Sequence, residues 1–347
     1  MKQLAKQLVI FLLPLGLVLA VVNYFGDAAN LFTDDYEASI AEFMLQGHHV
    51  TRLSEYNDRR LQIELVKRRS VGPNVAIIGS SRSLLLGNHH FYPSTTFNHS
   101  VYAAAWFDLE SMFNLLRTKG QLPDTLIVGI DPWTFNPNHV HVHTHTWGQY
   151  TGQAPHAQQT RPLKRFWERW SNLLSPSYFQ ASLQEFPKRI KGEAVPLPVR
   201  ERYNAKRTRC SDGSLTYDTI FGNADSLLVF ERVQLFLRGP LYGMKGYDTT
   251  DKEGFSAIQE MLLTARDEGV HTVLFFAPVA PQVYARLSNE YPIALLNEQR
   301  LRDWAAQERI EVRGRFNPHA SEIGIRHFYD GIHMNEIGMA VFFPLRK

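Results

Sequence analysis

The sequence predicts an α/β protein in which helices cover both faces of a parallel β-sheet, with an apolar N-terminal segment and a large insertion. Short β-branched runs alternate with stretches of helical periodicity, which is typical of βαβ units whose sheet is buried on both faces. The chain has 347 residues, of which 44% are hydrophobic and 20% charged. This composition supports a sizeable core and excludes a disordered, collagen-like or polytopic membrane protein.

A positively charged start precedes the apolar segment. Lys2 and Lys6 come before residues 8–22, which are almost entirely aliphatic, and Tyr24 and Phe25 follow as an aromatic pair. Positive charge before an apolar segment predicts a cytoplasmic N-terminus and an exported remainder. The aromatic pair extends the segment to nearly the length of a membrane span.

We expect residues 1–25 to form an uncleaved single-pass signal anchor. A cleaved signal peptide is the first alternative, with Val18-Leu19-Ala20 as a small-residue cleavage site. A buried core helix of a cytosolic protein is the second, but residues 8–22 contain no polar face. Both export interpretations place the body of the protein outside the cytoplasm.

The remainder divides into a connection, a main domain and an insertion within that domain. Residues 26–71 are charged, with helix-like spacing of apolar residues, so we expect a connecting helical segment before the main domain at residues 72–347. Strands are expected at the β-branched and apolar runs bounded by turn residues, namely residues 74–78, 95–101, 126–130, 272–276 and 310–312. Helices are expected where apolar residues recur at helical spacing, namely residues 107–119, 255–267 and 295–307.

Residues 132–250 interrupt this alternation and form the insertion. Within it, residues 161–209 hold 12 Lys and Arg against 4 Asp and Glu, a net charge of +8, whereas the whole chain carries only +3. The rest of the chain is therefore acidic. In a cytosolic protein such a basic, aromatic block would suggest nucleic acid. Outside the cytoplasm we expect no nucleic acid, and anionic lipid headgroups, an acidic glycan or a solvated basic face remain the alternatives.

Three short polar motifs lie at the expected ends of strands or in a loop near the C-terminus. They are Gly79-Ser80-Ser81-Arg82, Asn98-His99-Ser100 and Asp330-Gly331-Ile332-His333. The carboxyl ends of parallel strands meet at one edge of a sheet, so we expect the first two to lie close together. A serine becomes a nucleophile when an imidazole takes its proton and a carboxylate orients that imidazole. This pattern predicts a serine, histidine and aspartate triad.

The order and placement of these motifs resemble the first, second and fifth sequence blocks of the SGNH (GDSL-type) hydrolase superfamily. The resemblance covers residues 72–131 and 250–345, and it implies a three-layer α/β/α flavodoxin-like fold. It assigns the nucleophile to Ser81, the base to His333, the orienting acid to Asp330, and the oxyanion donors to Ser81, Asn98 and Ser100.

Two positions depart from that family's pattern. Ser80 stands where the family usually has an aspartate before the nucleophile. The third block ends in Asp131, so the asparagine that would donate to the oxyanion is missing unless Asn136 replaces it. We keep Asp131 as a candidate substrate-site residue without assigning its role.

The chain looks most like a membrane-anchored extracytoplasmic branch of the superfamily that takes part in O-acylation of cell-surface polymers. This resemblance implies an enzyme that transfers an acyl group to a cell-surface polysaccharide or removes one from it by hydrolysis. Acetyl is the acyl group we expect. The resemblance also implies a bacterial inner-membrane protein with a periplasmic domain, no cofactor, and a multi-span membrane O-acyltransferase as partner. A catalytically inactive, SGNH-like glycan-binding or assembly protein is the alternative.

Two further features bear on metals. The single cysteine, Cys210, excludes an intramolecular disulfide and cysteine-based metal sites. His139, His141, His143 and His145 would point to one side of an extended chain, a spacing that could bind zinc or copper. Loop histidines beside a cleft are more often solvated or in contact with substrate, so we assign no metal site.

Overall fold

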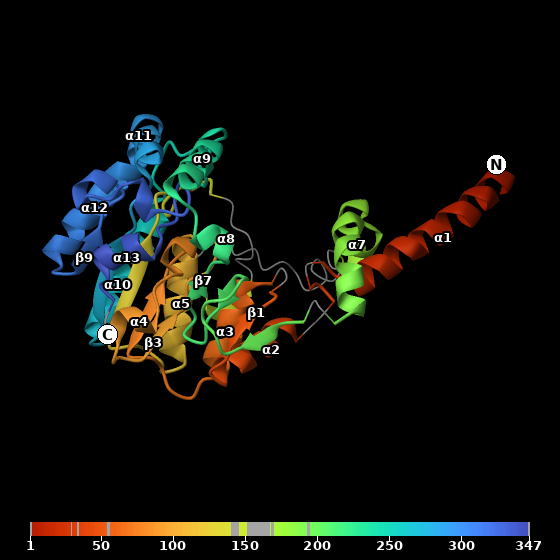
Figure 1. Cartoon of the computed structure of the whole chain (residues 1–347), viewed down its shortest axis with the longest axis horizontal. Helices are drawn as coiled ribbons and strands as arrows, with labels where there is room; N and C mark the ends of the chain where they lie inside the picture. The colour runs from red at the N-terminus through yellow and green to blue at the C-terminus, as the bar shows by residue number, and fades with distance from the viewer. Residues whose placement is uncertain are drawn as a thin grey trace.

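The protein is described from a computed structural model over residues 2–28, 30–32, 35–53, 56–139, 146–150, 167, 170–192 and 195–345. A body built on a parallel sheet contains the C-terminus, and the N-terminal helix α1 (Lys2–Gly26) extends away from it (Figure 1). Helix α7 (Pro176–Ile190) packs beside the C-terminal end of α1.

The body contains a five-stranded parallel sheet. Its strands are β2 (Val75–Ile78), β3 (Thr96–Asn98), β4 (Thr125–Ile130), β8 (His271–Phe276) and β9 (Glu311–Gly314). The strand order is β3-β2-β4-β8-β9, and all four neighbouring pairs are parallel. This is the flavodoxin-like order, in which the chain reverses direction across the sheet between the first and third strands. The prediction of a parallel α/β sheet with these five strands is confirmed.

Helices cover both faces of this sheet. Side chains alternate along β8, so neighbouring phenylalanines point to opposite faces. The Phe275 ring packs on Phe343, which follows α13, with ring centroids 5.0 Å apart, whereas Arg302 of α12 lies 5.7 Å from the Phe276 ring centroid. The helices of the body are α4 (Asn88–Phe91), α5 (Trp106–Thr118), α10 (Lys252–Asp267), α11 (Pro281–Glu290), α12 (Pro292–Gln307) and α13 (Glu336–Phe342).

The segment predicted as a helical connection, residues 26–71, contains one short strand in addition to helices. It contains α2 (Tyr36–Leu45), the short strand β1 (His49–Thr51) and α3 (Asp58–Arg68). Strand β1 pairs antiparallel with β5 (Leu197–Val199) and β6 (Thr208–Arg209), and β6 pairs with β7 (Leu215–Thr216). The insertion therefore completes a second sheet with the connecting segment instead of standing apart.

The remaining described helices of the insertion are short or amphipathic. They are α7, α8 (Thr219–Gly222) and α9 (Ser226–Leu237). Helix α9 joins the main core through Val229 and Val233, both buried. The Asn23 amide of α1 donates to the carbonyl oxygens of Asn172, Leu173 and Ser175, which fixes α1 to the turn that precedes α7.

Across the described ranges, none of the helices has both the length and the apolar character required to cross a membrane.

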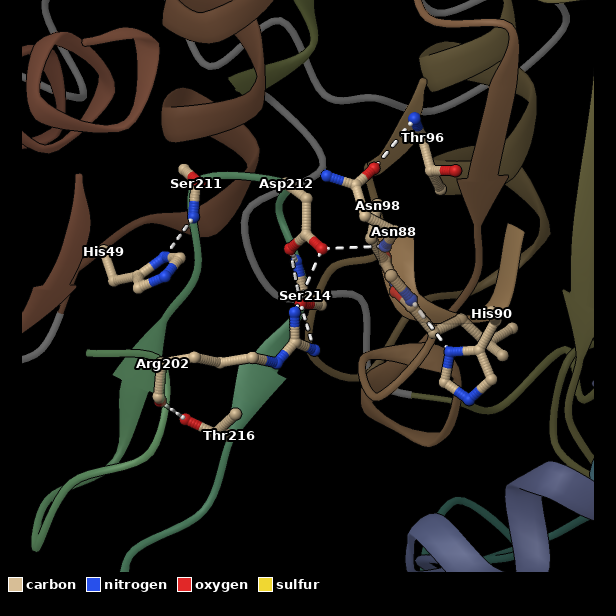
Figure 2. Close-up of polar contacts among 12 residues, drawn as sticks. His49, Asn88, His90, Thr96, Asn98, Arg202, Ser211, Asp212, Ser214 and Thr216 are labelled. Atoms are coloured by element: carbon tan, nitrogen blue, oxygen red, sulfur yellow. Dashed lines mark hydrogen bonds and ion pairs between the residues drawn. The ribbon is translucent and has the colours of Figure 1, made fainter. Parts of the chain in front are cut away.

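A buried carboxylate joins the turn of the second sheet to the body. Figure 2 shows Asp212, in the turn between β6 and β7, beside Asn88, Arg202 and Ser214. Its carboxylate accepts the Asn88 backbone N–H at 2.8 Å and the Ser214 backbone N–H at 3.0 Å, and it pairs with Arg202 at 3.2 Å. Burial alone would raise the pKa of Asp212, but Arg202 and these donors hold that pKa below its ordinary value.

We expect Asp212→Asn to lower the free energy of unfolding by about 3 kcal/mol, because it leaves Arg202 without its counter-charge. Urea denaturation followed by circular dichroism measures this loss. Glu308→Gln is the matched control, since it removes an exposed 2.7 Å ion pair with Arg266 and should change stability far less than Asp212→Asn does. Equal effects of the two substitutions would contradict the role given to Asp212.

Candidate active site

Ser81 lies at the point where the strand order reverses. It opens the helical turn η1 (Ser81–Ser83) directly after β2, and the Ser80 hydroxyl caps this turn by accepting the Arg82 backbone N–H at 3.2 Å. The turn packs closely on β4, since a Cβ on Gly129 would lie 2.3 Å from the Ser83 hydroxyl oxygen. In open α/β sheets this switch point, beyond the carboxyl ends of the strands, is where ligands bind.

The structure brings the three predicted triad residues together. The Ser81 hydroxyl lies 2.9 Å from Nε2 of His333, although the two residues are 252 positions apart in the sequence. Nδ1 of the same ring lies 2.8 Å from the Asp330 carboxylate. This arrangement favours the tautomer that carries its proton on Nδ1, which leaves Nε2 free to accept the proton of Ser81.

Asp330 is held as a carboxylate by its own loop. One of its oxygens accepts the backbone N–H groups of Ile332 and His333, each at 2.8 Å. Burial would raise the pKa of Asp330, but the His333 ring and these two N–H groups keep that pKa below its ordinary value. The His333 and Asp330 side chains are 20% and 22% exposed, so the triad is accessible from solvent.

Arg82, next to the serine, is the main structural link in the site. Its side chain is 1% exposed and pairs with Asp131, at the end of β4, at 3.0 Å. It also donates to the carbonyl oxygens of Ala277 and Pro278 beyond β8, and to that of Ile332 at 3.0 Å. Burial lowers the pKa of Arg82 and raises that of Asp131, and each charge offsets part of the other's shift. Asp131 therefore orients the site through Arg82, a role that the sequence did not reveal.

The predicted oxyanion donors need correction. Asn98 is fully buried, and its amide donates to the carbonyl oxygens of Ser83 and Leu86 at 2.7 and 2.8 Å. The Ser100 backbone N–H donates to the Asn98 side-chain oxygen at 2.9 Å. The Asn98 side chain therefore connects the loop after β3 to the segment after β2, because a buried amide must satisfy its own hydrogen bonds.

The other two candidate donors differ in whether they already hydrogen-bond within the fold. Asn136 does not replace the missing family asparagine, since its amide donates to the carbonyl oxygens of Gly243 and Lys245. Within the described part of the chain, no residue accepts the Ser81 backbone N–H. Of the donors predicted from the sequence, the Ser81 N–H is the one that remains available to a developing oxyanion.

The insertion contributes a residue that the sequence analysis missed. The Tyr217 ring packs edge-on to His333, with centroids 6.4 Å apart, and contacts the Tyr329 ring at 4.9 Å. Tyr217 follows β7, so the second sheet supplies one wall of the candidate active site. No spacing or motif singles out this tyrosine among the aromatic residues of the insertion.

The histidine repeat gives no metal centre in the described structure. His139 is buried, with its ring centroid 6.1 Å from that of Trp133, and His141, His143 and His145 lie outside the described residues. Among the residues that are described, no group of three or more His, Cys, Asp or Glu is placed to hold a metal ion.

No protein-family model matches the chain, and no curated protein resembles it significantly in sequence.

We expect Asp131→Asn to lower the free energy of unfolding by about 3 to 5 kcal/mol, because it leaves the buried Arg82 charge unpaired. The double variant Arg82→Met, Asp131→Leu should remain destabilised. It removes both charges, but it also leaves the carbonyl oxygens of Ala277, Pro278 and Ile332 without their shared donor. Urea denaturation of both variants tests this, and a double variant as stable as wild type would contradict the bridging role.

Proposed function

We propose that the chain is an SGNH-type serine enzyme that transfers an acyl group to a cell-surface polysaccharide or hydrolyses one from it. The acyl group we propose is acetyl. The observation that carries the proposal is the chain of contacts from Ser81 through His333 to Asp330 at a sheet switch point. An activated serine held in this way is suited to attack an ester carbonyl.

The chemistry follows from these positions. The Ser81 oxygen bonds to the acyl carbonyl carbon while its proton passes to Nε2 of His333. The carbonyl oxygen becomes an oxyanion beside the Ser81 N–H, and the carbon–oxygen bond to the leaving alcohol then breaks as that alcohol takes the proton from His333. A sugar hydroxyl or water, deprotonated by the same imidazole, attacks the acyl carbon, and the bond to the Ser81 oxygen breaks as that oxygen takes the proton back from His333. A sugar acceptor makes the protein a transferase, and water makes it an esterase.

A cavity lined by Tyr217, whose ring packs on His333, and by Tyr329, which precedes Asp330, supports a carbohydrate substrate. It has a volume of about 430 Å³, and its lining combines aromatic rings with amides and carboxylates. These residues include Tyr203, Tyr217, Tyr329, Asn204, Asp218, Asn223 and Glu336. Aromatic faces stack on sugar rings, and the polar groups can hydrogen-bond to sugar hydroxyls.

The proposed location is the outer face of the bacterial inner membrane, with residues 1–25 as the anchor and the body in the periplasm. The charge and apolar pattern of this segment supports that location, as does the exposure of aliphatic side chains such as Leu12, Leu13 and Leu17 in α1. A multi-span membrane O-acyltransferase that delivers the acyl group is the proposed partner.

A non-catalytic glycan-binding or assembly protein is the second candidate. The observation that favours it is the engagement of the Asn98, Ser100 and Asn136 donors within the fold. An oxyanion stabilised by fewer donors is reached more slowly, and losing one such donor typically reduces turnover by about 100- to 1,000-fold.

We expect the purified full-length protein to release p-nitrophenol from p-nitrophenyl acetate, and Ser81→Ala to reduce this rate by at least about 1,000-fold. Ser288→Ala is the matched control, since its exposed hydroxyl bonds only locally to the Ala285 carbonyl oxygen at 3.0 Å. Mass spectrometry of the same reaction with an added oligosaccharide separates transfer from hydrolysis. Equal rates for wild type and Ser81→Ala would refute the enzyme and favour the binding protein.

A further inference from the structure

A second polar pocket lies at the opposite end of β2 from Ser81. It has a volume of about 590 Å³ and opens beside the residues that precede β2 and β3, such as Pro73 and Thr95. Its other walls come from the end of α2, the segment after α3, and the turn that contains Asp212. Because Ser81 follows the carboxyl end of β2, this pocket is separate from the candidate active site.

Arg69, the residue directly after α3, lines this pocket and has no ion-pair partner among the described residues. Its guanidinium group stacks over the Phe97 ring, with the central carbon 3.7 Å from the ring centroid. Its Nη1 is shut off from solvent and has no hydrogen-bond partner within the described ranges. Burial lowers the pKa of Arg69 to about 10, and no described carboxylate opposes that shift. A partly buried cation without a counter-charge is costly unless a ligand supplies one.

The carboxylate in the pocket wall is already neutralised. Figure 2 shows the Asp212 carboxylate directed toward Asn88, Ser214 and Arg202, which provide its hydrogen bonds and its counter-charge. Arg68, the other arginine of the lining, is exposed and pairs with Glu64 at 3.1 Å. The cation that the pocket leaves unmatched is therefore Arg69.

We propose that this pocket binds an oxyanion, the carboxylate or phosphate group of a small molecule or of an acidic sugar, with Arg69 as its principal donor. The planar guanidinium offers parallel N–H groups that match both anions, and the stacked Phe97 ring fixes its plane before the ligand arrives. The Ser70 hydroxyl of the lining provides a neutral donor for the rest of the ligand. The site does not include Ser81, so anion binding can be tested independently of the proposed activity.

Isothermal titration of the full-length protein with D-glucuronate, inorganic phosphate and D-glucose, at constant ionic strength, tests the site. We expect glucuronate or phosphate to bind with a Kd near or below about 1 mM and glucose, which lacks the anion, not to bind. The anion that binds more tightly identifies the source as a carboxylate or a phosphate. Arg69→Gln should weaken that binding by at least about tenfold, the loss expected for one charge-assisted interaction.

Two further variants keep the test decisive. Val71→Glu places a carboxylate in the same pocket at a 75% exposed position and should abolish anion binding while Arg69 stays in place. Arg266→Gln removes an exposed, distant arginine and should leave binding unchanged, as should Ser81→Ala. Failure of wild type to bind either anion would overturn the proposal, and so would equal affinity in wild type, Arg69→Gln and Val71→Glu.

Discussion

One buried guanidinium, that of Arg82, ties the carboxyl ends of three parallel strands to the C-terminal loop. It follows β2, pairs with Asp131 after β4, and donates to carbonyl oxygens beyond β8 and to that of Ile332. Removing an arginine from water is tolerated only when its charge is paired and its N–H groups are engaged. Because Ile332 directly precedes His333, the same side chain fixes the backbone that presents the imidazole to Ser81.

The strand order explains why this one residue can reach so far. The order β3-β2-β4-β8-β9 places the end of β2 beside that of β4, with β8 next to β4. An arginine just beyond β2 therefore lies within side-chain reach of three chain segments that are distant in the sequence. The reversal of strand order at this point also opens the crevice that exposes Ser81. The fold and the candidate chemistry thus depend on the same reversal of strand order.

The five strands and the triad could be predicted because each has a local signal. A buried parallel strand is a β-branched run, and its end is a turn, so Ser81 could be placed from the sequence. The second sheet could not be predicted, since its strands have only two or three residues each and pair across distant segments. The sequence predicted the positions of Asn98 and Asp131 at strand ends but not what their side chains do. A buried polar group takes its partners from tertiary contacts, which local sequence does not show. Tyr217 was missed for the same reason.

The most direct test of the account is covalent labelling with a fluorophosphonate. The phosphorus of this reagent bonds to a serine oxygen, with loss of fluoride, when an imidazole accepts the serine proton. Peptide mapping by mass spectrometry of the labelled full-length protein gives the site. We predict one adduct, on Ser81, that disappears in His333→Gln and persists in His271→Gln, which alters an exposed histidine far from the site. A folded wild-type protein with no adduct on Ser81, or with equal labelling in His333→Gln, would contradict the account.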